Sequence, residues 1–308
     1  MIISVDHGNK QVKVAHKTFP SGLVESLGVS PLGGDHIFYE GKYYSLSEKQ
    51  RIPYMRDKTK DDRFFILTLF AIAYEIEANS AYSPDEIIDV QLLIGLPPAH
   101  FARQKEAFEK YFLRDDFIEF RFNDKEYTIM IDKVFSAPQA LVAIMPVFEQ
   151  VKTISKGIII DIGGMTVDYI MVKKGAADAS VCDSLEHGVI TLYNDIKSEI
   201  YAEHDMLCEE SDIDAVLKNE ETALPDDVVE FIKESAKKFV SDIIDQLRER
   251  GIDMKTSTAI FAGGGSLLLK EYIEAEERIV SSLIIDSISA NAKGYEVLYK
   301  HSRLNEKE

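Results

Sequence analysis

The sequence contains few cysteines and no long run of apolar residues. Only Cys182 and Cys208 occur among its 308 residues, which fits two thiols in a reducing compartment better than a disulfide framework. No cysteines and histidines stand at the spacing of a zinc site, and no apolar stretch is long enough to span a bilayer. The first residues lead into a strand pattern without the basic and apolar regions of a signal peptide. We therefore expect a cytoplasmic protein that is not attached to a membrane.

Positive charge is also scarce. The 35 lysines and arginines are outnumbered by 53 aspartates and glutamates, which gives a formal net charge of −18. Such a surface does not neutralise the phosphates of duplex nucleic acid, and it is equally unsuited to anionic lipid. We expect no direct binding of nucleic acid. Binding of a nucleotide remains open, because it needs only a few local donors and a metal ion.

The two commonest nucleotide-binding loops are missing. The sequence has no G-x-x-x-x-G-K-[ST] loop and no G-x-G-x-x-G fingerprint. It has instead a glycine pair after a buried strand pattern. In "DIGGMTVD", residues 161–168, two aspartates bracket Gly163, Gly164 and Thr166 directly behind the apolar residues 157–160.

The length and the pattern of the elements indicate two α/β domains. A chain of 308 residues is too long for one simple core. Strands alternate with helices along it, which is typical of an α/β fold. The apolar spacing predicts helices at about 61–79, 99–111, 138–147, 188–202, 225–250, 267–275 and 290–300. Strands are expected at 2–5, 11–15, 90–94, 127–135, 157–161, 167–172, 257–261 and 282–285, with irregular strands and loops over 19–57.

One pattern occurs twice. "IISVDHGNKQVKV" and "GIIIDIGGMTVDYIMV" both consist of an apolar strand, an aspartate at its end, a glycine turn and a returning strand. Asp6 and Asp161 lie 155 residues apart, which is close to half the chain. Each hairpin alone is common, but the pair indicates two lobes of one design that offer their turns to a shared cleft.

The residue types in these hairpins suit a triphosphate with a metal ion. Glycine turns let backbone N–H groups converge on an oxyanion. Carboxylates would repel phosphate unless a divalent ion and its waters lie between them. We therefore expect Asp6 and Asp161 to hold hydrated Mg²⁺, and Asp168 to orient or deprotonate an attacking water. Thr166 and Lys13 add a hydroxyl and a positive charge near the phosphates.

A third glycine segment follows a later strand. In "AIFAGGGSLL" three glycines, Gly263, Gly264 and Gly265, allow the backbone to lie flat against a ring or a ribose. Ser266 is expected to be the N-cap of the next helix. Alone, this segment is a simple strand-to-helix turn. Together with the two hairpins it indicates an adenosine site.

These motifs, in this order, resemble those of the actin-like ATPase superfamily. "DHGNKQVK" at 6–13 and "DIGGMTVD" resemble its two phosphate motifs, and "FAGGGS" its adenosine motif. "SAPQAL" at 136–141 and "ANAKGYEVL" at 290–298 resemble its two connecting helices. Within the superfamily, the short length and "LLIGLPPAHFARQKEAFEKYF" most resemble bacterial plasmid-segregation actins of the ParM and StbA type.

The resemblance implies a role for each matching residue. Asp6 and Asp161 would bind Mg²⁺, and Asp168, Gln139 and Asp161 would form the catalytic set, with Gln139 orienting the water; a solvated surface position for Gln139 is the alternative. The contact of His7 is left open. The implied nucleotide-binding residues are Gly8, Asn9, Lys10, Lys13, Gly163, Gly164, Met165, Thr166, Gly263, Gly264, Gly265 and Ser266.

The resemblance also implies a fold and a function. We expect two lobes with ribonuclease-H-like mixed sheets flanked by helices and a nucleotide cleft between them, lobe I over 1–152 and 291–308 and lobe II over 153–290. The implied activity is an ATPase that uses ATP with Mg²⁺, or GTP, and polymerises into filaments that segregate plasmid DNA through a DNA-binding adaptor. A small-molecule kinase, or a slowly hydrolysing scaffold for division, pilus assembly or cell shape, is the alternative.

Overall fold

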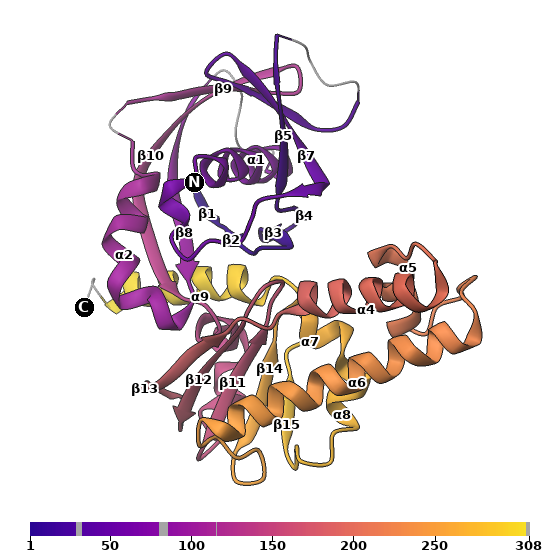
Figure 1. Cartoon of the computed structure of the whole chain (residues 1–308). Helices are drawn as coiled ribbons and strands as arrows, with labels where there is room; N and C mark the ends of the chain where they lie inside the picture. Colours follow the sequence, from indigo (N-terminus) through magenta and orange to yellow (C-terminus); the bar gives the residue numbers. More distant parts are fainter. Residues whose placement is uncertain (29–32, 80–85, 115, 306–308) are drawn as a thin grey trace. The chain divides into compact units, whose positions relative to one another are not determined.

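The computed structural model describes residues 1–28, 33–79, 86–114 and 116–305. The chain forms two compact units (Figure 1). Unit 1 comprises Met1–Pro146 together with the chain from Ser289 onward, and unit 2 comprises Val147–Ile288. Each unit has a core of its own.

Unit 1 is built on strands. In its described part, one sheet has the order β1-β8-β10-β9-β6-β7-β5 and a smaller one the order β2-β3-β4. Strands β1, β8 and β10 are parallel, and the remaining pairs are antiparallel. The strands are β1 (Ile2–Ser4), β2 (Asp6–His7), β3 (Gln11–Lys13), β4 (Thr18–Pro20), β5 (Gly22–Leu27), β6 (His36–Tyr39), β7 (Lys42–Arg51), β8 (Ile87–Leu96), β9 (Ile118–Phe122) and β10 (Lys125–Pro138).

Helix α1 (Arg63–Ala78) forms the centre of the unit 1 core. Every residue from Phe64 to Ile76 is buried, as expected for a helix that is apolar on all sides. It contacts strands β3 and β6. Helix α2 (Pro98–Phe112) packs on β8 and β10 and on the short 3-10 helix η1 (Lys58–Lys60), while α9 (Ala290–Asn305) packs on β1, β8 and β10.

Unit 2 contains a sheet whose described strands have the order β13-β12-β11-β14-β15. They are β11 (Gly157–Ile162), β12 (Val167–Lys173), β13 (Ala176–Leu185), β14 (Thr258–Ala262) and β15 (Ser282–Ile284). The long helix α6 (Asp226–Glu249) buries an apolar stripe that includes Ile232, Phe239 and Ile243, and it contacts α4, α5 and α8. The other helices are α3 (Phe148–Val151), α4 (Val189–His204), α5 (Glu210–Leu217), α7 (Gly264–Leu268) and α8 (Lys270–Glu274).

The two units repeat one topology. In unit 2, β11 pairs antiparallel with β12, β12 with β13, and on its other side β11 pairs parallel with β14 and β14 with β15. In unit 1 the segment β1–β2 has the same role: β2 and β3, and β3 and β4, are antiparallel, whereas β1 and β8, and β8 and β10, are parallel. The prediction of two lobes of one α/β design is confirmed.

The structure corrects three expected elements. The helix predicted over 138–147 is absent from this described stretch: β10 continues through Pro138, and a 3-10 helix η2 (Val142–Val147) follows a tight turn. Pro138 ends a strand here because β10 stays in register with β8 up to Leu96. The helix predicted over 267–275 is divided into α7 and α8 at Leu269, and α7 begins at Gly264. Residues 19–57 contain the regular strands β4 to β7, with 29–32 outside the described residues.

Candidate nucleotide site

Asp6 stands at the centre of a polar cluster in unit 1. The residue is only 2 % exposed, and both of its carboxylate oxygens have partners. Gln139 Nε2 donates to Oδ1 at 2.7 Å, and Lys13 Nζ lies 3.4 Å from Oδ2. A buried carboxylate needs such partners to stay charged. The structure thus brings together Asp6, Lys13 and Gln139, three residues that the sequence analysis assigned to one site.

Gln139 reaches this cluster from a turn, not from a helix. Its backbone N–H donates to Leu96 O at 2.8 Å, and the next residue, Ala140, has a positive φ of 62°. The N–H of Ala140 donates to Asn291 Oδ1 at 3.1 Å, so α9 holds the turn from the other end of the chain. A non-glycine residue in this conformation persists only where its surroundings impose it. Gln139 is buried, and the alternative of a solvated surface position is wrong.

The first glycine turn has little room. A Cβ on Gly8 would lie 2.5 Å from Gln11 O and 3.5 Å from Lys13 Nζ, and the Gly8 N–H donates to Asp6 O at 2.9 Å. Asn9 and Lys10, at the tip, are half-buried. The turn therefore has no room for a side chain at position 8, and its tip is only partly exposed.

His7 points away from this turn into the core of unit 1. Its ring is fully buried and stacks on Phe112, with ring centroids 5.3 Å apart. Thr68 Oγ1 donates its proton to Phe64 O at 2.9 Å, so His7 Nε2 is the donor in the 2.7 Å bond to that hydroxyl. Nδ1 is then unprotonated, and it has no hydrogen-bond partner among the described residues. Burial, with the nearby Lys58 charge, lowers the pKa of His7 to about 3.

The second hairpin places two aspartates opposite each other. Asp161 and Asp168 are register partners on β11 and β12, and each is 6 % exposed. Asp168 accepts hydrogen bonds from Ser184 Oγ at Oδ1 and from Thr166 Oγ1 at Oδ2, the latter 3.4 Å long. Like charges directly opposite on a sheet destabilise it, so this pair favours a nearby cation. Ser184 was missed in the sequence, because only the β12–β13 register brings it to Asp168.

Helix α4 organises the turn of this hairpin. The N–H groups of Gly188, Val189 and Ile190 donate to the carbonyls of Met165, Gly163 and Gly164 at 2.8–3.1 Å. With these carbonyls bound to the helix start, the N–H groups of Gly164 and Met165 have no backbone acceptor in the described part of the chain. Amides arranged in this way can bind an oxyanion. Gly188 has no room for a side chain here, since its Cβ would lie 2.3 Å from Gly164 O.

The glycines at 263–265 differ in whether a side chain would fit at their positions. Gly263 has φ of +87°, and its Cβ would lie 2.2 Å from Asp161 Oδ1. A Cβ on Gly265 would lie 2.4 Å from Ile162 Cγ2, whereas one on Gly264 would make ordinary contacts at 3.5 Å with Ile288. Ser266 is not the N-cap of α7, because that position is Gly263. Ser266 lies within α7 and is fully buried, and its Oγ donates to the carbonyl oxygen of Ala262 at the end of β14. The segment is thus packed tightly on the β11 strand end.

The two aspartates suit Mg²⁺, which keeps several water ligands, better than a metal ion whose ligands all come from the protein. Among the described residues, no group of three or more histidines, cysteines or carboxylates could hold a metal ion. Mg²⁺ uses few carboxylates and completes its shell with water and phosphate oxygens. Asp6 and Asp161, buried at the strand ends and beside glycines where no Cβ fits, have this chemistry.

Two family models match the sequence. Residues 4–141 match the N-terminal domain of actin-like proteins, and residues 159–275 match the C-terminal domain of an archaeal MreB-like actin homologue. No curated protein matches the sequence.

Solved structures of low sequence identity share the fold over almost the whole chain. A 15-stranded ParM filament from Clostridium botulinum is 18% identical, with a TM-score of 0.75 over 97% of this chain and 99% of that one. The archaeal actin homologue Ta0583 is also 18% identical, with a TM-score of 0.77 and the same coverage. An AlfA filament bound to AMPPNP is 16% identical, with a TM-score of 0.62 over 100% of this chain and 98% of that one.

The fold class is therefore confirmed, and the resemblance read from the motifs is confirmed with it. The repeated sheet topology, the two glycine hairpins and the matches along both units agree with one another. The chain belongs to the actin-like protein superfamily.

Proposed function

We propose that this protein is an ATPase that binds ATP with Mg²⁺ through its two glycine hairpins, one from each unit, and assembles into nucleotide-dependent filaments. The observation that carries the proposal is the duplicated hairpin with a buried aspartate at the end of its first strand, Asp6 in unit 1 and Asp161 in unit 2. The glycine segment 263–265, packed on that second strand end, supports an adenosine site.

The side chains around each aspartate fit distinct tasks. Bound Mg²⁺ would neutralise charge on the phosphate oxygens. Asp168, which accepts hydrogen bonds from Ser184 and Thr166, would orient a water or take its proton. Gln139 donates to Asp6 through Nε2, which leaves its Oε1 to accept a hydrogen bond from water. An amide suits this position because a carboxylate would repel Asp6.

The relatives support self-association. ParM and AlfA are filaments in their structures, and Ta0583 has been crystallised with ADP. We propose that filaments of this chain move plasmid DNA through a DNA-binding adaptor, and the net charge of −18 supports an adaptor over direct contact with DNA. Closure on the nucleotide would favour the assembled state and hydrolysis would weaken it.

Right-angle light scattering combined with phosphate release tests the proposal. With ATP and Mg²⁺ we expect scattering to rise and then decay as phosphate appears. The Asp168→Ala variant should bind nucleotide and polymerise, while its phosphate release falls at least about 100-fold because the water loses its base. Normal turnover by this variant would contradict the role of Asp168. Phosphate transfer to a metabolite without any change in scattering would instead indicate a kinase.

A further inference from the structure

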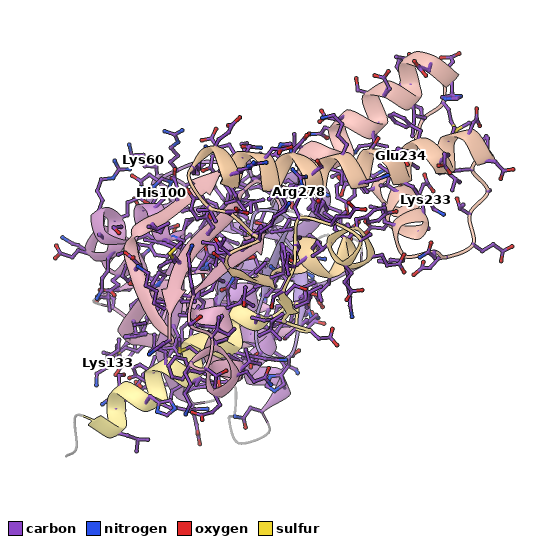
Figure 2. The ribbon with its side chains drawn as sticks, turned by 90° about the horizontal axis from the view of Figure 1, so that it is seen from below. Lys60, His100, Lys133, Lys233, Glu234 and Arg278 are labelled. Atoms are coloured by element: carbon purple, nitrogen blue, oxygen red, sulfur yellow. The ribbon has the colours of Figure 1, made fainter. Side chains whose placement is uncertain are left out.

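A buried lysine contacts the first glycine turn, and it belongs to none of the motifs found in the sequence. Lys58 is the first residue of η1 and is only 6 % exposed. Lysines are rarely buried to this extent unless the charge has a purpose or a partner, because removing an ammonium group from water is costly. Its neighbour Lys60, on the same turn, is the opposite case: its side chain is 79% exposed, and Figure 2 shows it extending away from the ribbon.

The contacts of Lys58 join it to the turn that carries Asp6. Its Nζ donates to the backbone carbonyl of His7, the residue between Asp6 and Gly8. The same ammonium lies 5.4 Å from the centroid of the Phe64 ring. Because Asp6 directly precedes His7 in the chain, the ammonium binds the peptide carbonyl of the residue next to Asp6. The His7 side chain is fixed between α1 and α2, so Lys58 holds the backbone carbonyl of His7 while the two helices hold its ring.

A positive charge in this place has an electrostatic effect on the turn. In a site of low effective dielectric, a buried ammonium acts over several ångströms with little screening. It offsets the negative charge of Asp6 and lowers the electrostatic energy of an anion bound at the turn. The effect grows with the charge of the anion, so it is larger for a triphosphate than for a diphosphate.

We propose that Lys58 is a positioning residue for the nucleotide phosphates. Its buried ammonium group, hydrogen-bonded to the His7 carbonyl, makes the first glycine turn selective for the triphosphate over the diphosphate. This inference rests on the proposed function. A lysine that only ties η1 to the turn would affect stability, and it would not change the preference between nucleotides.

The test is the affinity of the full chain for Mg-ATP and for Mg-ADP, measured by calorimetry for the wild type and four variants. Lys58→Met keeps the aliphatic stem but removes donor and charge, and we expect ATP to bind about ten-fold more weakly and ADP about three-fold more weakly. Lys58→Gln keeps a donor without the charge and should behave like Lys58→Met. Lys58→Arg keeps the charge and should retain the preference for ATP. Lys60→Met, the matched control, should bind both nucleotides as the wild type does.

The outcomes separate this inference from the proposed function. Equal weakening of both nucleotides by Lys58→Met, or wild-type preference in Lys58→Gln, overturns the role of the charge while the proposed function stands. Wild-type protein that binds neither nucleotide overturns both. If Lys58→Met does not fold, the comparison of Lys58→Gln with Lys58→Arg decides, with thermal melting recorded for each variant.

Discussion

At the scale of single residues, the position of each aspartate in the candidate site depends on the side chains that bind it. Asp6 is held by Gln139 and Lys13, and Asp168 by Thr166 and Ser184. His7 stands directly beside Asp6 in sequence but has another environment, with a ring buried against Phe112 and Thr68. One residue of the motif thus belongs to a polar cluster, and the next is buried in the core of unit 1.

The buried His7 predicts a pH dependence of stability. Its pKa is about 3 in the folded chain and 6.5 as an ordinary value, so the unfolded chain binds the extra proton between these limits. The free energy of unfolding should therefore fall as the pH drops below 6.5, by up to about 1.4 kcal/mol per pH unit from this group.

A comparison with His7→Phe isolates this contribution. Urea unfolding of both proteins between pH 4 and 8 measures it, since phenylalanine fits an aromatic pocket and does not titrate. We expect the difference in stability between the two proteins to be constant above about pH 7 and to change by one proton's slope below about pH 6. A difference that stays constant over the whole range would show that His7 is protonated in the folded chain as readily as in the unfolded one.

At the scale of elements, the second hairpin depends on two helix starts. The first residues of α4 bind the carbonyls of the turn, and α7 begins directly against the end of β11. Such close approach of backbones explains why Gly188, Gly263 and Gly265 tolerate no side chain, whereas Gly264 does.

The pair of adjacent glycines in α7 provides a matched test. Gly265→Ala should lower the free energy of unfolding by about 1–3 kcal/mol, because its Cβ would overlap Ile162 Cγ2. Gly264→Ala, with contacts no closer than 3.5 Å, should be neutral or stabilising by up to about 1 kcal/mol, since alanine favours a helix. Chemical denaturation of both variants measures this. Equal losses would mean that the two positions are packed alike.

At the scale of the whole molecule, net charge opposes assembly. Copies of a chain with a charge of −18 repel one another, and salt screens that repulsion. We expect the critical concentration for ATP-dependent polymerisation to fall several-fold as KCl rises from about 10 to about 200 mM. Sedimentation of polymer at each salt concentration measures it. A critical concentration that rises with salt would indicate contacts dominated by pairs of opposite charge.

In the described part of the chain, none of the helices combines the length and the apolar character that a membrane-spanning segment needs.

The sequence alone determined the repeated strand–aspartate–glycine pattern, and with it the α/β class, the hairpins and the positions of Asp6, Asp161 and Asp168. Local chemistry is sufficient there, because strand alternation and glycine turns are set by neighbours in the chain. The tertiary structure decided the turn at Gln139, the place of Ser184 and the buried Lys58. Each depends on a distant partner: Ala140 is held by Asn291, 151 residues away, and Lys58 binds a carbonyl 51 residues away. No local pattern encodes such contacts, since they form only when separate elements pack into one core.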